Sequence, residues 1–382
     1  MPVYNSKDQH RHGDMRMKIL VLSNYANGLF LFRKEVLQAF QRQGYETVIS
    51  VPYDENCRKL EDMGFLVLPT EFERRGSNPV HDFKLFLKYM KLLKEQRPDV
   101  VLTYTIKPNL YGGLACRIKR IPYFVNITGL GTAVEKQGLM GRALIAFYRV
   151  AVQKAACVFF QNEGNKQFML EHGVGKKRNR LLPGSGVNLQ EHPYESYPCE
   201  DEGIIFLAVL RIMKDKGIEE YLTAAQQIGK EFPESRFYLA GEYEQESKKD
   251  YEPWIQRLSD EGKLKYFGHI DNVPEVMAKS HVIVHPSYHE GLSNVLLEAA
   301  ACGRPVLASD VPGCRETLQN GLSGLTFPAK DARGLTQAMK TILSYSKSDR
   351  QEMGIRGREY VEEVFDRQKV IGIYLEEIGK SL

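Results

Sequence analysis

The chain has 382 residues, of which 43% are hydrophobic and 26% charged, and its formal net charge is +4. That length is too great for one ordinary core, so we expect two domains of roughly 150–200 residues. So small a net charge does not favour a nucleic-acid-binding protein. The six cysteines form no CxxC pair and have no histidines at zinc-ligand spacing, which indicates free thiols in a reducing compartment.

The first residues are not expected to form a secretory signal. Residues 1–15 are polar and contain no apolar stretch, which predicts a disordered extension rather than a secretory signal. No run of 18 apolar residues predicts a membrane span anywhere in the chain. We therefore expect a cytoplasmic protein.

From Met17, short β-branched runs alternate with longer amphipathic segments. This alternation predicts βαβ units around a parallel sheet. The expected strands of the first half are 17–23, 47–52, 65–69, 99–104, 123–128 and 157–162. The expected helices are 30–44, 54–63, 81–96, a segment after Pro108, and 138–156.

A proline-containing acidic stretch at 186–202 interrupts the pattern and predicts a linker, after which the alternation restarts. The strands expected in the second half are 203–210, 236–241, 264–268, 281–287 and 305–309. The helices expected there are 217–231, 248–261, 273–280, 294–302 and a last one at 350–379. We thus predict an N-terminal Rossmann-like domain at 16–185 and a C-terminal one at 203–365, with ligands at the carboxyl ends of both sheets.

The sharpest motif is YHEGLSNVLLEAAACGRPVLAS at 288–309, which predicts a strand, a loop, a capped helix and a strand. Ser293 is a good N-cap for the short helix. The free N–H groups of Ser293, Asn294 and Val295 would then point out of the helix start, where a diphosphate is well held.

Two carboxylates flank this helix start. Glu290 lies just before it and Glu298 about one turn inside it. A bare carboxylate repels phosphate, so the pair makes sense if both accept hydrogen bonds from sugar hydroxyls. The alternative is a surface helix with two solvated glutamates.

The segment VLRIMKDKG at 209–217 follows the first strand of the second half. It places Arg211 and Lys216 in a strand-to-helix turn. A guanidinium and an ammonium suit a dianionic leaving group, because both stabilise negative charge that grows as a bond breaks. The alternative is a pair of solvated basic residues.

A third motif, SNYANGLFLFRKE at 23–35, follows the first strand of the chain. Its Gly28 would let the backbone approach a ligand closely, although a tight turn alone also explains a glycine here. The chain has no GxGxxG and no GxxxxGK[ST] motif, so redox and ATPase functions lose their main support.

The segments HEGLSNVLLEA and LRIMKDKG resemble the two signature motifs of retaining glycosyltransferase family 4, whose members have the GT-B fold. The resemblance covers nearly all of the chain from Met17. It implies an α/β fold of two Rossmann-like parallel-sheet domains that face a central cleft. It also implies that the helix at 366–382 crosses back onto the N-terminal domain.

The resemblance implies roles for individual residues. Arg211 and Lys216 would bind the diphosphate and, with Glu290 toward the donor sugar, act in catalysis. Glu298 would bind the ribose hydroxyls. The other donor-binding positions that the resemblance implies are Gly28, His269, Ile270, Gly291, Leu292, Ser293, Asn294 and Val295.

One departure from the family concerns the run NITGLGT at 126–132, which has Thr128 where many members have a histidine. Threonine is no base near neutral pH, so Thr128 and Gly129 are expected only to position substrate. A front-face retaining reaction needs no enzyme base, because the departing phosphate can take the acceptor proton. No Asp-x-Asp tract is present, so we expect neither a metal nor a cofactor besides the UDP-sugar donor.

The runs NITGLG and TYTIKPNLYGG resemble those of a bacterial subgroup that extends undecaprenyl-diphosphate-linked sugars with N-acetylhexosamine, such as the N-acetylgalactosaminyltransferase of N-glycan assembly. The acceptor would then be a lipid-linked saccharide. Lys107 and Asn109, after a strand, would line the acceptor side.

Such an acceptor requires a membrane-facing surface. Lys84, Lys88 and Lys91 share one helix face, and the region 138–156 mixes apolar and basic residues. Both suit an anionic membrane surface, which predicts peripheral attachment at the inner face of the cytoplasmic membrane. An ordinary solvated helix face is the alternative.

Other functions stay open at this point. A GT-B nucleotide-sugar epimerase, a phosphorylase-like enzyme and a transferase with a soluble acceptor would carry similar motifs. A non-catalytic binding protein is disfavoured, because a pure binder has no need of Arg211 and Lys216 as leaving-group stabilisers.

Overall fold

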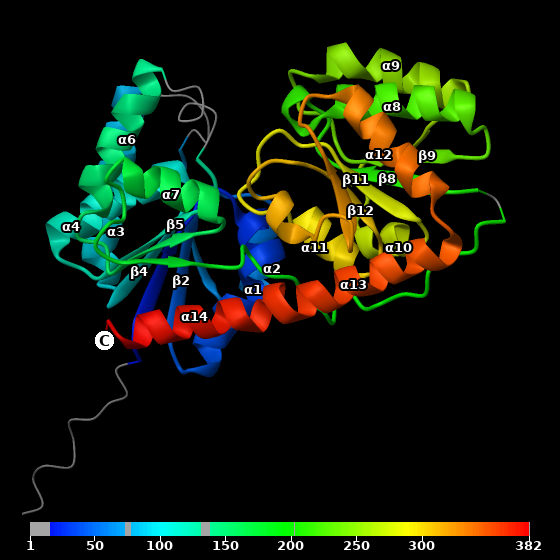
Figure 1. Ribbon diagram of the computed structural model, residues 1–382. Coiled ribbons are helices and arrows are strands. Elements are labelled where there is room, and N and C mark those ends of the chain that lie inside the picture. The colour runs from blue at the N-terminus through cyan, green and yellow to red at the C-terminus, as the bar shows by residue number, and fades with distance from the viewer. Residues whose placement is uncertain (1–15, 73–77, 131–137, 202, 382) are drawn as a thin grey trace, which may run out of the picture. The chain divides into compact units, whose positions relative to one another are not determined.

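The structure, a computed structural model, describes residues 16–72, 78–130, 138–201 and 203–381 (Figure 1). Residues 1–15, predicted to be a disordered extension, lie outside the described residues. The chain forms two compact units. One comprises residues up to 159 together with 169–180 and the chain from 373 onward, and the other comprises 160–168 and 181–372.

A seven-stranded sheet forms the core of the first unit, in the order β3-β2-β1-β4-β5-β6-β7. Its strands are β1 (Lys18–Leu22), β2 (Glu46–Val51), β3 (Leu66–Pro69), β4 (Val100–Tyr104), β5 (Tyr123–Ile127), β6 (Cys157–Phe160) and β7 (Asn179–Leu181). Central β1 pairs in parallel with β2 and β4, so that Leu20 faces both Val48 and Val101. These strands are almost wholly buried, as expected where helices cover both faces of a parallel sheet.

Helices connect these strands. They are α1 (Ala26–Arg42), α2 (Asn56–Asp62), α3 (Pro79–Gln96), α4 (Gly113–Lys119), α6 (Leu139–Val152) and α7 (Glu163–Glu171). The helix expected after Pro108 opens as a π-helix, η1 (Pro108–Gly112), before it continues as α4. Asn78 fixes the start of α3, because its side chain accepts hydrogen bonds from the N–H groups of Val80 and His81.

The second unit contains a six-stranded sheet in the order β10-β9-β8-β11-β12-β13. Its strands are β8 (Ile205–Val209), β9 (Arg236–Ala240), β10 (Lys265–Tyr266), β11 (Val282–His285), β12 (Val306–Ser309) and β13 (Gly324–Phe327). Its helices are η2 (Lys214–Lys216), α8 (Ile218–Glu231), α9 (Lys248–Asp260), α10 (Val273–Ala278), α11 (Asn294–Ala301), η3 (Arg315–Thr317), α12 (Ala332–Ser344) and α13 (Lys347–Phe365). The last helix, α14 (Arg367–Gly379), begins in the second unit and belongs to the first from residue 373 onward. The α/β class with two Rossmann-like parallel sheets is therefore confirmed.

The last helical segment differs from its prediction as one helix over 350–379. It breaks at Asp366, whose ψ of 127° is not helical. Val187 lies against the break: its N–H donates to the Phe365 carbonyl, and its own carbonyl accepts from Arg367. Asp366 then caps α14, because its carboxylate accepts from the Gln368 N–H at 2.9 Å. The long-range contact with Val187 thus breaks the helix, although the pattern of apolar residues over 350–379 is continuous in the sequence.

The described part of the stretch expected to be a linker, residues 186–201, contains no helix or strand, and a buried arginine holds part of it. Arg304 is fully buried and donates to the carbonyls of Glu195 and Ser196 at 3.0 and 2.9 Å. The Arg350 guanidinium pairs with Glu200 at 2.7 Å. Both contacts lie within the second unit.

Candidate active site

The turn after β11 places a glutamate beside a buried histidine. His285 ends the strand, and its Nε2 lies 2.9 Å from Oε1 of Glu290. An ionised carboxylate only accepts hydrogen bonds, so this nitrogen donates. Nδ1 is buried and has no partner among the described residues. His285 was not among the predicted site residues, although it ends an apolar strand five positions before Glu290.

A lysine from the turn after β8 reaches the same carboxylate. Lys216 Nζ lies 2.6 Å from Glu290 Oε1, and the two side chains are 19% and 16% exposed. Burial alone would raise the pKa of Glu290, but the hydrogen bond from His285 and the charge of Lys216 outweigh it and hold that pKa well below its ordinary value. Glu290 is therefore a fixed negative charge that orients the Lys216 ammonium.

The backbone joins these two turns. The N–H of Tyr288 donates to the Asp215 carbonyl at 2.9 Å, and the Tyr288 hydroxyl donates to the Glu220 carboxylate at 2.7 Å. Gly217 has a φ of +73°, and a Cβ there would lie 2.1 Å from the Pro286 carbonyl oxygen. Only glycine suits both the backbone angle and this close approach, so Gly217 sets the position of Lys216.

Helix α11 starts as predicted at Ser293, whose hydroxyl accepts from the Leu296 N–H at 3.4 Å. The expectation that the Ser293 N–H is free is wrong, because it donates to the Gly313 carbonyl at 2.8 Å. The N–H groups of Asn294 and Val295 have no acceptor among the described residues. Those two N–H groups, at the positive end of the helix, are the ones able to bind an anion.

The residues around the helix start divide between ligand-facing and structural roles. The buried Asn294 Oδ1 has no partner in the described part of the chain. Asn162 Nδ2 donates to the carbonyl of Gly291, and thereby fixes the loop before the helix. Leu292 is buried in an apolar cluster with Leu297, so its side chain anchors the loop and only its backbone can face a ligand.

Glu298 lies one turn into α11 and is half-buried. Burial raises the pKa of Glu298 to about 7, while Arg367 opposes this shift and Glu191 adds to it. Its carboxylate accepts no hydrogen bond from any residue that the structure describes. A partly desolvated carboxylate without donors is suited to bind hydroxyl groups.

Arg211 does not join Lys216 and Glu290 in a contact. Its guanidinium, 57% exposed, pairs with Glu244 Oε2 at 3.0 Å. Glu244 follows β9, and its N–H donates to the Ile212 carbonyl at 3.1 Å. Glu244 was not among the predicted site residues, because nothing in the motif around Arg211 indicates a partner from another strand end.

Two of the predicted donor-binding residues, His269 and Ile270, lie after β10. The ring of His269 is exposed, with weak contacts of 3.7 Å to Glu242 and 3.5 Å to Asp271. The side chain of Ile270 packs against the apolar cluster under the sheet. No backbone hydrogen bond of His269 or Ile270 exists within the described residues, so these groups are open to a ligand.

The predicted acceptor residues of the first unit divide into two groups. Asn109 is 1% exposed, and its amide accepts from Thr103 Oγ1 and donates to the Asn126 carbonyl, both at 2.8 Å. Lys107 pairs with the buried Asp82 at 2.8 Å. The expectation that Asn109 lines an acceptor surface is therefore corrected, because its buried side chain supports the turn after β4. The half-buried Lys107 follows the same strand, and its role toward an acceptor stays a prediction.

The other predicted residues of this unit are more accessible. Thr128 and Gly129 follow β5 and are half-buried, and a Cβ on Gly129 would meet no atom within 4 Å. Gly28 is the third residue of α1, and a Cβ there would approach the Tyr25 ring at 3.4 Å. Their roles toward substrate stay predictions.

Both units match known families. Residues 18–162 match the family described as Glycosyl transferase 4-like, and residues 195–360 match Glycosyl transferases group 1. The chain is a glycosyltransferase with one domain of each kind. No helix in the described ranges of this glycosyltransferase is long and apolar enough to cross a membrane.

Curated relatives match most of the glycosyltransferase. N,N'-diacetylbacillosaminyl-diphospho-undecaprenol alpha-1,3-N-acetylgalactosaminyltransferase of Campylobacter jejuni is 29% identical over 87% of this chain and 90% of its own length. UDP-Gal:alpha-D-GlcNAc-diphosphoundecaprenol alpha-1,3-galactosyltransferase of Escherichia coli is 24% identical over 69% of this chain and 71% of its own. Capsular polysaccharide biosynthesis glycosyltransferase CapM of Staphylococcus aureus is 24% identical over 75% of this chain and 78% of its own.

Solved structures agree with the GT-B fold of this glycosyltransferase. HepE of Anabaena in complex with UDP superimposes with a TM-score of 0.78 at 18% identity, over 96% of this chain and all of its own. At that identity the likeness describes the fold alone.

Proposed function

We propose that the glycosyltransferase binds a UDP-sugar at the start of α11. The observation that carries this proposal is the convergence of Lys216, the free N–H groups of Asn294 and Val295, and the donor-free carboxylate of Glu298 within one unit. The cation and the N–H groups match a diphosphate, and the carboxylate matches ribose hydroxyls. Glu290, which accepts a hydrogen bond from His285, would also accept one from a sugar hydroxyl. The backbone of His269 and Ile270 would read the base.

The proposed reaction is a metal-independent transfer with retention of configuration. The bond from the anomeric carbon to the UDP oxygen breaks, and the acceptor hydroxyl oxygen bonds to the same face of that carbon. A phosphate oxygen of the departing UDP takes the acceptor proton, so the enzyme needs no base. Lys216 and Arg211 stabilise the charge that grows on UDP, and Thr128 and Gly129 position the substrate.

The proposed acceptor is a polyprenyl-diphosphate-linked saccharide in the synthesis of a cell-surface polysaccharide or glycan, and the proposed sugar is N-acetylhexosamine. The names of the Campylobacter and Escherichia relatives support this choice, because both state transfer to an undecaprenol-diphosphate-linked sugar. These relatives are transferases, which favours this function over the alternatives of a nucleotide-sugar epimerase or a transferase with a soluble acceptor.

A lipid-linked acceptor favours peripheral attachment at the inner face of the cytoplasmic membrane. Two surfaces of the first unit support this part of the proposal. Helix α3 exposes Lys84, Lys88 and Lys91, and α6 begins with the exposed Leu139 and Met140. Basic and apolar side chains of this kind suit an anionic lipid surface.

A thermal-shift screen of the purified enzyme with UDP, GDP, ADP and CDP tests donor binding first. Ligands that bind the native state raise its melting temperature by mass action, so UDP should give the largest rise. Transfer is then measured from UDP-N-acetylhexosamines to undecaprenyl-diphosphate-linked saccharides. We expect product with a retained anomeric configuration by NMR, and undiminished turnover in excess EDTA.

Three results would overturn parts of this proposal. UDP released at full rate without acceptor would indicate an epimerase or a hydrolase. Equal turnover with free saccharides would remove the need for a lipid-linked acceptor. Activity lost in EDTA and restored by a divalent metal would show that the charge on UDP is not neutralised by Lys216 and Arg211 alone.

A further inference from the structure

A pocket of about 600 Å³ lies at the beginnings of β5, β6 and β7 in the first unit. Tyr123 at the start of β5, Ala156 just before β6 and Arg178 just before β7 line it. In parallel sheets, substrates bind at the carboxyl ends of the strands, where Thr128 and Gly129 lie. This pocket is at the opposite edge of the same sheet, so the proposed transfer reaction does not use it.

The pocket is strongly basic. Among the residues that the structure describes, no acidic side chain lines it, and five basic ones do: Arg117, Arg120, Lys154, Arg178 and Lys380. The Arg117 guanidinium donates to the Val150 carbonyl at 2.8 Å, which orients it without neutralising its charge. The exposed Arg120 and Lys154 form no ion pair with any residue in the described part of the chain.

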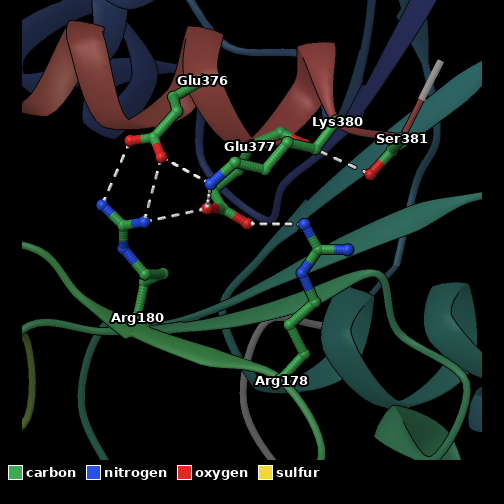
Figure 2. A network of polar contacts seen from close by, with 6 residues as sticks. All are labelled: Arg178, Arg180, Glu376, Glu377, Lys380 and Ser381. Atoms are coloured by element: carbon green, nitrogen blue, oxygen red, sulfur yellow. Dashed lines mark hydrogen bonds and ion pairs between the residues drawn. The ribbon is translucent and has the colours of Figure 1, made fainter.

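Figure 2 shows how the remaining two cations are held at the end of α14. The carboxylate of Glu377, 2% exposed, lies 3.2 Å from Arg178 Nη2 and 2.8 Å from Lys380 Nζ. Both cations remain accessible, Arg178 at 43% and Lys380 at 44%. The buried carboxylate therefore fixes them in place while their other N–H groups face solvent.

We propose that this pocket binds a phosphate-bearing anion, either a soluble diphosphate-like compound or the phosphate headgroup of an anionic lipid. Arginine forks and lysine ammonium groups bind phosphate oxygens well, and a volume of several hundred Å³ accommodates more than one phosphate. The exposed Ile118 and Val150 adjoin Arg117, one in sequence and the other through its carbonyl. At a membrane surface, these apolar side chains would contact the lipids while the basic pocket binds a headgroup.

Binding of inorganic pyrophosphate, measured by calorimetry in saturating UDP, tests the pocket apart from the donor site. The double variant Arg120→Gln/Lys154→Gln removes two exposed cations that hold no other group, so its fold should persist. We expect pyrophosphate affinity to fall by about tenfold or more. Arg58→Gln/Lys59→Gln, the same charge change on α2, should bind pyrophosphate like the wild type.

Lys216→Ala should also keep this binding of pyrophosphate, so a failure of the proposed donor site is distinguishable from a failure of this pocket.

Vesicles distinguish the two sources of phosphate. If the ligand is a lipid headgroup, co-sedimentation with vesicles of phosphatidylglycerol and phosphatidylcholine should weaken in Arg120→Gln/Lys154→Gln and not in Arg58→Gln/Lys59→Gln. If the ligand is soluble, both variants should sediment alike while their pyrophosphate affinities differ. The proposal is overturned if the two double variants match each other in pyrophosphate binding and in sedimentation.

Discussion

Lys216 Nζ lies 2.6 Å from Glu290 Oε1, although 74 positions separate the two residues in the chain. The same carboxylate oxygen is 2.9 Å from His285 Nε2. The ammonium is thus held at the loop before α11 by a partner that stays ionised. A bound diphosphate can engage the remaining N–H donors of Lys216 without any rearrangement of the turn.

Replacement of Lys216 by alanine should lower the turnover of the transferase by about 100- to 1,000-fold, because it removes a preorganised positive charge from the leaving group. Lys214→Ala is the matched control. Lys214 belongs to the same 3₁₀ turn but is 66% exposed and pairs with Glu219 at 3.5 Å. Steady-state kinetics with circular dichroism should show two folded variants, of which only Lys216→Ala is inactive. Near wild-type turnover in Lys216→Ala would contradict the assignment.

Gly217→Ala should destabilise the second unit by about 2–5 kcal/mol, since it combines a left-handed backbone with a steric clash. The added Cβ would meet the Pro286 carbonyl oxygen at 2.1 Å. Gly262 has a similar φ of +67°, but a Cβ there would meet nothing within 4 Å. Urea unfolding of Gly262→Ala should therefore report only the backbone cost of about 1–2 kcal/mol. Equal losses in the two variants would show that the approach to Pro286 is unimportant.

Glu298 should make the ligand-free enzyme less stable as pH rises from about 4.5 to about 7. Burial raises the pKa of Glu298 from its ordinary value of 4.5 to about 7, so in this range the folded state keeps a proton that the unfolded state has lost. The cost reaches up to about 3 kcal/mol above pH 7. Glu298→Gln, which cannot ionise, should gain stability relative to the wild type over the same range. A difference in unfolding free energy that does not change with pH would contradict this.

UDP binding should follow the ionisation of the same carboxylate. If ribose hydroxyls donate to ionised Glu298, the affinity of the wild type relative to Glu298→Gln should rise by up to tenfold per pH unit below about 7 and then level off. UDP titrates in the same way in the experiments with the wild type and with Glu298→Gln, so its own ionisation does not change the ratio of the two affinities. Calorimetry across this range measures it, and a ratio that is constant with pH would remove Glu298 from the ribose site.

The sequence predicted the parallel strands well, because buried strands of this fold are short apolar runs between clear helical patterns. It missed β7, β13, α7 and α12, which lie where the alternation is weak. It located Lys216, Glu290 and the N-cap Ser293 through local motifs. It missed His285, although this residue is only five positions before Glu290, and it missed Glu244, whose contact with Arg211 depends on which strand ends are neighbours.

The sequence by itself therefore determined the α/β class, the cap of α11 and the residue types at the start of that helix. Each of these can be predicted from the order and spacing of residues in short segments of the chain. Only the tertiary structure decided that the Ser293 N–H donates to the Gly313 carbonyl and that Asn109 is a core residue. It also decided that one pocket is lined by basic side chains from four places: α4, the end of α6, the start of β7 and the end of α14. These contacts join segments far apart in the chain, and the order of strands in the sheet, which periodicity does not encode, brings them together.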